Sequence, residues 1–181
     1  MVKLIARYPC NELLPIFAGD NTLSELAPTV ITSVSPALGQ KKTASAALKK
    51  ACGLGFPAAN RMTGKGEVRC IWFGPAQAML FGASPVVIKG ASLTDQTDGW
   101  AVLQLQGKQA SDILARLVPV DLRISTFKTR HTARTILFHM PVSITRSGAN
   151  SYDIMVFRSM AVTAVHELEL AMKSVASMNT Q

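Results

Sequence analysis

Residues 100–119 read WAVLQLQGKQASDILARLVP, and they carry the clearest structural pattern in the chain. Apolar side chains alternate at Ala101, Leu103 and Leu105, which predicts a half-buried strand. After Gly107 the apolar spacing becomes helical and predicts a helix over residues 109–118 that stops at Pro119. The helical stripe consists of Ala110, Ile113, Leu114, Leu117 and Val118.

Downstream, the pattern predicts three more strands and a closing helix. Residues 132–140 and 142–146 are expected strands split at Pro141, and residues 147–150 form a turn. Residues 152–157 return as the hairpin partner, and Ser159 is placed to cap a final helix reaching about Val175. The apolar stripe of that helix is Ala161, Val165, Leu168, Met172 and Val175.

Upstream, the pattern is weaker. Residues 43–52 favour a helix because they are rich in alanine, and Gly53 is suited to end it in a left-handed conformation. Residues 68–73 and 77–81 are expected strands joined by a tight turn at Gly74-Pro75. The first forty residues are punctuated by proline and are expected to be irregular, apart from a short strand over residues 2–6.

These elements predict an α+β fold with largely antiparallel sheets and helices packed on one side. We expect two small subdomains. Residues 1–92 form an N-terminal α+β subdomain with an irregular start, and residues 93–181 form a βαβββα subdomain. Together they are expected to make one compact domain, a size that 181 residues allow.

The composition indicates a surface that is covered by a partner. Apolar residues make up 48% of the chain and charged residues 17%, against roughly 25% charged in a typical soluble domain. No apolar run approaches the ~18 residues of a membrane-spanning helix, and no signal peptide is recognisable, so no membrane partner is expected. Cys10, Cys52 and Cys70 are widely spaced and odd in number, which predicts free thiols and a cytoplasmic location.

The net charge of +8 is unevenly spread. Residues 1–90 hold ten Lys or Arg against four acids, and residues 91–181 hold nine against seven. Most of the excess lies within residues 41–69, and an acid-free stretch over residues 122–134 carries three arginines and a lysine. Such a balance suits nucleic acid, an anionic cofactor, an acidic protein partner or a solvated basic face. Aromatic residues are only 6%, and residues 41–50 contain none, which disfavours nucleic acid.

A search for chemistry finds no motif in a suitable context. Residues 53–58 match G-x-G-x-x-A, but a helix precedes them and Pro57 interrupts them. Gly64-Lys65-Gly66 lacks the rest of a phosphate-binding loop. The three histidines, His131, His139 and His166, lack zinc-ligand spacing, and His139 is expected in a strand as a core or interface residue. We therefore predict no catalytic, cofactor-binding or metal-binding residue in this chain.

Ordered blocks over about residues 50–175 carry a family resemblance. They are GFPAAN at 55–60, CIWFGPAQAML at 70–80, DQTDGW at 95–100, LQGKQA at 105–110, LVPVDL at 117–122, Phe127, ART at 133–135 and YDIMVFRSMA at 152–161. Together they resemble the gamma subunit of heterotetrameric sarcosine oxidase, whose fold is related to the folate-binding aminomethyltransferases. Residues 1–45 show little of this resemblance.

The resemblance implies a non-catalytic subunit in a complex with alpha, beta and delta subunits that oxidatively demethylates sarcosine to glycine. It implies FAD, FMN and NAD in the two large subunits, zinc in delta, and tetrahydrofolate as one-carbon acceptor. Folate-using relatives carry an acidic pair where residues 140–145 here have no carboxylate, so no folate chemistry is expected.

Individual positions then take structural roles. Gly74-Pro75, Gly107 and Asp121 are expected turn or cap positions, and Arg158 either anchors a polar network or is an exposed helix-start residue. Two alternatives remain open, a free-standing folate-binding protein of one-carbon metabolism and a basic nucleic-acid-binding module.

Overall fold

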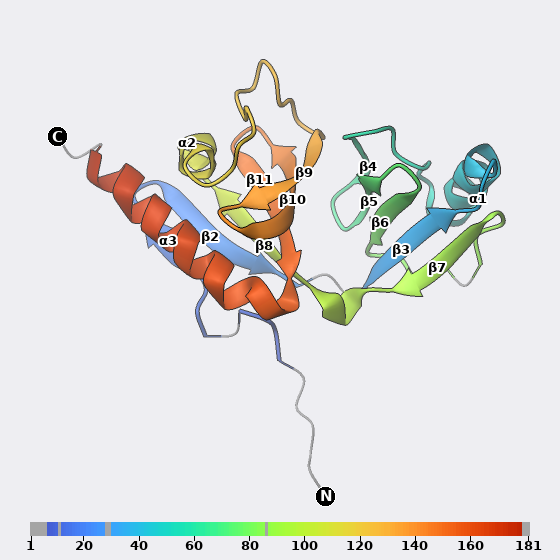
Figure 1. The fold of residues 1–181 in the computed structure, drawn as a ribbon, viewed down its shortest axis with the longest axis horizontal. Helices are drawn as coiled ribbons and strands as arrows, with labels where there is room; N and C mark the ends of the chain where they lie inside the picture. Colours follow the sequence, from blue (N-terminus) through green and yellow to red (C-terminus); the bar gives the residue numbers. More distant parts are fainter. Residues whose placement is uncertain (1–6, 11, 28–29, 86, 179–181) are drawn as a thin grey trace, which may run out of the picture.

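Two antiparallel sheets face each other, and helices cover the outer face of each (Figure 1). The computed structural model describes residues 7–10, 12–27, 30–85 and 87–178. The predicted α+β class with antiparallel sheets is confirmed, and each sheet has its helices on one side. The predicted strand over residues 2–6 lies outside the described residues.

The six-stranded sheet has the order β1-β2-β8-β11-β10-β9. Its strands are β1 (Ile16–Ala18), β2 (Asn21–Leu26), β8 (Trp100–Gln106), β11 (Ser151–Phe157), β10 (Met140–Gly148) and β9 (Thr132–Leu137). The helices α2 (Ala110–Ala115) and α3 (Ala161–Met178) cover one face. The predicted stripe of α3 is confirmed, because Ala161, Val165, Leu168, Met172 and Val175 are all buried there.

The five-stranded sheet has the order β4-β5-β6-β3-β7. Its strands are β4 (Met62–Lys65), β5 (Val68–Gly74), β6 (Gln77–Phe81), β3 (Ile31–Pro36) and β7 (Ala91–Asp95). The helix α1 (Lys41–Cys52) covers the outer face of this sheet and packs Ala44 and Leu48 against it. The helix ends at Gly53, whose φ of 75° is left-handed. The predicted helix end and the β5–β6 hairpin are therefore confirmed.

A third apolar layer lies between the sheets and changes the character of β8. Trp100 and Val102 point toward the five-stranded sheet, where they meet residues such as Ile71 and Phe81. Leu103 and Leu105 point the other way, into the core beneath α2 and α3. The expectation of a half-buried strand is wrong, because a second sheet covers the face that the alternation assigned to solvent.

Three local predictions need correction. The break between β9 and β10 lies at Phe138 and His139, and Pro141 sits inside β10 opposite Ile136, before pairing with β11 starts at Val142. The helix predicted over 109–118 is shorter, because α2 covers Ala110–Ala115. Ser159 does not cap α3; it lies within the 3₁₀ turn η2 (Arg158–Met160) that precedes the helix.

The amino-terminal part is more regular than expected, because residues 16–36 contain β1, β2 and β3. β1 and β2 join the sheet of the carboxyl-terminal half, whereas β7 joins the other sheet. The division into residues 1–92 and 93–181 stays a prediction about folding units. The six-stranded sheet takes β1 and β2 from the first range and its other four strands from the second.

The predicted turn positions are confirmed by geometry. Gly74 pairs with Gln77 at the β5–β6 turn, and the Asp121 carboxylate accepts the backbone N–H of Arg123 at 3.1 Å. Gly107 has φ +143°, and a Cβ there would lie 2.2 Å from Asn21 Oδ1. Only glycine therefore allows β2 to approach this turn so closely.

Candidate functional site

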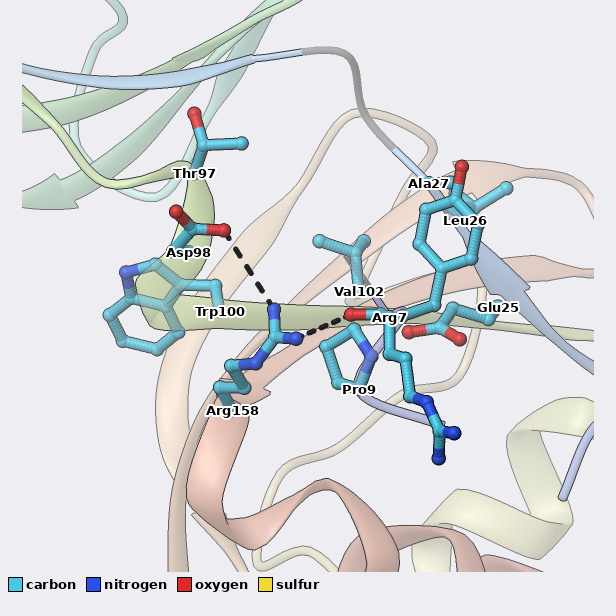
Figure 2. A pocket seen from close by; sticks show the side chains of 11 residues that line it. Arg7, Pro9, Glu25, Leu26, Ala27, Thr97, Asp98, Trp100, Val102 and Arg158 are labelled. Atoms are coloured by element: carbon cyan, nitrogen blue, oxygen red, sulfur yellow. Dashed lines mark hydrogen bonds and ion pairs between the residues drawn. The ribbon is translucent and has the colours of Figure 1, made fainter. Parts of the chain in front are cut away.

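A pocket of about 280 Å³ opens where the two sheets are joined by the chain (Figure 2). The pocket lies beside the 3₁₀ turn η1 (Thr97–Gly99), which connects β7 to β8. The segment that leads into β1 lines it as well. The lining residues come from five parts of the chain and are Arg7, Tyr8, Pro9, Glu25, Leu26, Ala27, Thr97, Asp98, Trp100, Val102 and Arg158.

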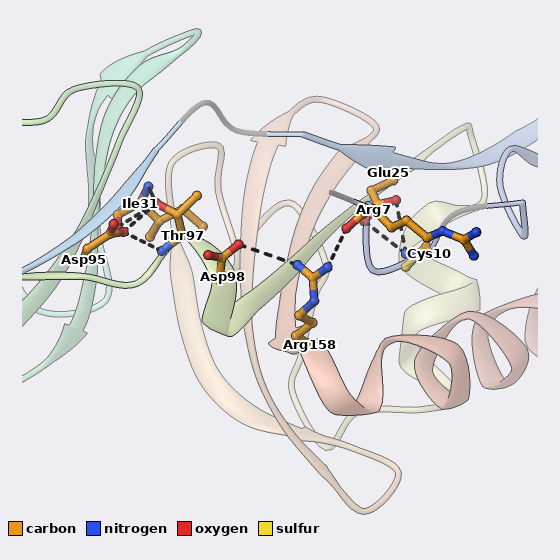
Figure 3. Close-up of polar contacts among 8 residues, drawn as sticks. All are labelled: Arg7, Cys10, Glu25, Ile31, Asp95, Thr97, Asp98 and Arg158. Carbon is orange, nitrogen blue, oxygen red and sulfur yellow. Dashed lines mark hydrogen bonds and ion pairs between the residues drawn. The ribbon is translucent and has the colours of Figure 1, made fainter. Parts of the chain in front are cut away.

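Arg158 reaches across the pocket from η2. Its Nη1 lies 3.9 Å from Asp98 Oδ1, and its Nη2 donates to the carbonyl of Arg7 (Figure 3). Of the two roles predicted for Arg158, the structure confirms the anchor of a polar network. The Asp98 side chain is fully exposed, so solvent screens this ion pair and the carbonyl contact matters more for position.

Glu25 lies on β2 at the other side of the pocket. Both of its carboxylate oxygens accept the backbone N–H of Cys10 at 3.3 Å. Burial raises the pKa of Glu25, while the bonds from Cys10 and the charge of Arg158 oppose that rise. The carboxylate thus holds the amino-terminal segment against β2.

Cys10 is the candidate nucleophile nearest this carboxylate, and its environment keeps it inert. Burial, with the neighbouring Glu25 charge, raises the pKa of the Cys10 thiol to about 12. A thiol is nucleophilic only as the thiolate, which this environment disfavours. The arrangement of Arg158, Glu25 and Cys10 can therefore bind and position groups, but it supplies no activated sulfur.

Trp100 lines the pocket and also belongs to an aromatic stack at the inter-sheet core. Trp100 meets Phe73 edge-on at a centroid distance of 5.2 Å and stacks on Phe157 at 4.4 Å. Arg134, from the edge strand β9, lies over the Phe73 ring at 3.8 Å. These contacts join β5, β8, β9 and β11, and Trp100 is the member that lines the pocket.

The turn that carries Thr97 is tied to the five-stranded sheet. Thr97 Oγ1 accepts the backbone N–H of Ile31 at 3.0 Å and donates to Asp95 Oδ1 at 2.7 Å. The bonds from Thr97 lower the pKa of Asp95. The chain therefore crosses from one sheet to the other at a fixed point beside the pocket (Figure 3).

A second, polar cleft of about 620 Å³ lies between the sheets, near the β4–β5 hairpin. Within it, Arg69 of β5 pairs with Asp153 of β11 at 3.3 Å. Gln104 and Ser147 also donate to Asp153, at 3.0 and 2.8 Å. Because Asp153 and Arg69 satisfy each other, this network ties the sheets together, and the exposed Glu67 is the other carboxylate that lines the cleft.

The histidines do not gather at either cavity. His131 pairs with Arg61 in an isolated bridge, and its pKa is lowered by burial and by Arg61 and Lys128. His139 was expected in a strand, but it lies exposed in the β9–β10 turn beside Phe138. His166 is exposed on α3.

Metal ligands and nucleotide motifs are likewise not assembled. Within residues 7–10, 12–27, 30–85 and 87–178 no three His, Cys, Asp or Glu side chains cluster as a metal site would require. Gly64-Lys65-Gly66 belongs to the β4–β5 hairpin, and Gly53 is a helix end. The expectation that the chain has no catalytic, cofactor-binding or metal-binding residue stays a prediction.

Sequence reasoning singled out Arg158 but not its pocket. Arg7, Glu25 and Trp100 are separated along the chain by tens of residues, and no spacing pattern links them. The ordered blocks at 95–100 and 152–161 were the available signal, because they contribute Thr97, Asp98, Trp100 and Arg158.

The chain shares its fold with an aminomethyltransferase. The glycine cleavage system aminomethyltransferase T from Bartonella henselae superposes with a TM-score of 0.55 at 15% identity, over 81% of this chain and 44% of that one. No family model matches the chain. The described part of the chain contains no helix with the length and apolarity needed to cross a bilayer.

Two closer relatives place the chain more narrowly. It is 31% identical to sarcosine oxidase subunit gamma of Corynebacterium sp. (strain U-96) over 168 residues, covering 83% of this chain and 78% of the relative. It also superposes on a chain of heterotetrameric sarcosine oxidase from Corynebacterium sp. U-96, solved in complex with pyrrole 2-carboxylate. That match has a TM-score of 0.83 and 27% identity, over 94% of this chain and 96% of that one. The chain belongs to the sarcosine oxidase gamma subunit family, which confirms the resemblance of the ordered blocks.

Proposed function

We propose that this chain is the non-catalytic gamma subunit of a heterotetrameric sarcosine oxidase and supports oxidative demethylation of sarcosine to glycine. The observation that carries the proposal is the match to a chain of such a complex over 94% of this chain and 96% of that one. A likeness that spans both chains almost completely favours the same role in the same kind of assembly.

In this proposal the chemistry belongs to the partner subunits. Alpha and beta carry FAD, FMN and NAD, delta carries zinc, and tetrahydrofolate accepts the one-carbon unit in a cytoplasmic complex. The pocket described above supports this division, because the Cys10 thiol is held protonated and the groups of Glu25 and Arg158 are engaged with backbone partners. Neither nucleic acid nor a membrane is an expected partner.

The test is a mild affinity purification of the tagged chain from its native cells. We expect a yellow complex far heavier than the 19.4 kDa chain, whose flavin absorbance bleaches when sarcosine is added without oxygen. In air the same complex should produce hydrogen peroxide, and the chain released from it should be colourless and inactive.

A colourless monomer recovered from cells grown on sarcosine would contradict the proposal. The chain would then be titrated with tetrahydrofolate, because binding by the isolated chain is what a free-standing folate-binding protein of this fold predicts.

A further inference from the structure

The two basic stretches of the sequence meet at one place on the surface. The loop before β9 lies against the segment that leads into β4 (Figure 1). Met62 N donates to the carbonyl of Arg130 at 2.9 Å, and Thr132 N donates to the carbonyl of Asn60 at 3.1 Å. These bonds bring Arg61, which precedes β4, beside Lys128 and Arg130 of the loop before β9, and Lys65 at the end of β4 lines the same cleft as Arg130. We call the side chains of Arg61, Lys65, Lys128 and Arg130 the basic seam.

The basic seam is a concentration of charge that the chain does not neutralise itself. All four side chains are exposed, and within the described residues none of them forms an ion pair, whereas Arg69, Arg123 and Arg158 each have a carboxylate partner. Burial lowers the pKa of His131, and the charges of Arg61 and Lys128 lower it further. Two carboxylates, Glu67 and Asp153, line the same cleft as Lys65 and Arg130. Asp153 is paired with Arg69, so Glu67 is the carboxylate of that cleft set against the four positive charges.

The backbone holds the basic seam in a fixed shape. Asn60 and Arg130 both have left-handed backbones, with φ of 56° and 70°, a conformation uncommon for residues other than glycine. Arg130 is bonded on both sides, since its N–H donates to the carbonyl of Arg146 at 2.8 Å and its own carbonyl accepts from Met62. Uncommon backbone conformations that the surrounding bonds enforce are typical of functional surfaces.

We propose that the basic seam is the surface on which this chain docks an acidic face of a partner subunit. The inference deepens the proposed subunit role and rests on it. Charged surfaces of this kind steer encounter and set orientation, so their effect falls on the association rate and on its dependence on salt. A partner bound here would contact both sheets at once and bridge them.

A protein partner suits the basic seam better than nucleic acid. Single-strand binding combines a basic groove with exposed aromatic rings on which bases stack. The four side chains of the basic seam are not aromatic. The aromatic ring that contacts the neighbouring His131 is Phe127, which is buried.

The test compares two double variants of equal charge change during reconstitution of the complex from the purified chain and the remaining subunits. Lys128→Glu with Arg130→Glu reverses one half of the basic seam, and Lys42→Glu with Lys50→Glu reverses two exposed lysines of α1. We expect the seam variant to associate at least about tenfold more slowly at low salt and with a weaker salt dependence, and the α1 variant to change by less than about threefold.

A third variant, Arg61→Glu with Lys65→Glu, reverses the other half of the basic seam and should behave like the first. It guards against misfolding of the loop at Arg130, and thermal unfolding of each variant is measured alongside. The proposal would be overturned if the seam and α1 variants associated equally slowly, or if neither seam variant associated more slowly than the unmodified chain. Either result would leave the subunit role intact.

Failure of the unmodified chain to join any complex would instead remove the proposed function itself. Tight binding of the unmodified chain to mixed oligonucleotides, lost in both seam variants, would overturn the protein-docking proposal in favour of a nucleic-acid surface.

Discussion

Two aspartate–arginine pairs in this chain have the same chemistry and opposite environments. The side chains of Arg69 and Asp153 are 12% and 4% exposed, whereas those of Arg123 and Asp121 are 81% and 37% exposed. Removing one partner of a buried pair leaves the other charge without compensation. We expect Asp153→Asn to lower the free energy of unfolding by about 3–5 kcal/mol, measured by urea denaturation.

Asp121→Asn is the matched control, because solvent screens that pair, and its effect should stay below about 1 kcal/mol. Equal losses in the two variants would show that the pair between the sheets has no special role.

The three cysteines differ in reactivity for reasons of burial. Desolvation raises the pKa of Cys10 and Cys70 to about 12, and both are buried, whereas Cys52 is partly exposed. Because burial raises the folded-state pKa of both thiols, the thiols of the unfolded chain ionise first, and this contribution to stability is lost as pH rises from about 9 toward 12. At pH 8 we expect a thiol reagent to modify Cys52 first and the other two only after unfolding, as peptide mass analysis would show.

In denaturant all three thiols should react at similar rates. Rapid labelling of Cys10 in the folded chain would contradict the pocket geometry, since Cys10 is held beside Glu25.

Helix α3 offers a matched pair of leucines. Leu168 is fully buried against the six-stranded sheet, and Leu170, two residues on, is 51% exposed. Leu168→Ala removes packed atoms and leaves a cavity, so we expect a loss of about 2–5 kcal/mol in the free energy of unfolding. Leu170→Ala should change it by no more than about 0.5 kcal/mol.

Both values come from the same urea titration. If Leu170→Ala lowered the free energy of unfolding strongly in the intact complex but not in the isolated chain, that side of α3 would be a subunit contact.

At the level of elements, the sequence was informative where one periodicity dominated. The stripe of α3 and the helix end at Gly53 were predicted because helical spacing and left-handed glycine are local signals. β1, β2 and β3 were missed because these short strands lie between prolines and turns, and distant β8 and β6 complete their pairing. The half-buried prediction for β8 failed because its second face carries the apolar Trp100 and Val102, which the five-stranded sheet covers.

At the level of the whole molecule, the family was predictable and the pocket was not. Ordered blocks survive in the sequence as a linear signal, and the comparisons confirm what they indicated. The pocket and the basic seam depend on long-range placement, which brings Arg7 to Arg158 and Arg61 to His131. The sequence did show both basic stretches, but only the fold shows that they converge.

The two tryptophans test whether the sheets unfold as one unit, as the predicted single compact domain requires. Trp72 lies on β5 of the five-stranded sheet, and Trp100 lies on β8 of the other. Trp100 packs into the apolar core that both sheets share. Unfolding of one sheet should therefore expose the apolar face of the other sheet and unfold it as well. Trp72→Phe leaves Trp100 as the fluorescent reporter, and Trp100→Phe leaves Trp72. In each variant we expect a single fluorescence transition in urea, with the same midpoint as the transition followed by far-ultraviolet circular dichroism. A remaining tryptophan that reports unfolding at a urea concentration different from the dichroism midpoint would mean that the sheets are separate folding units, and the shared core would then be a docking contact between them.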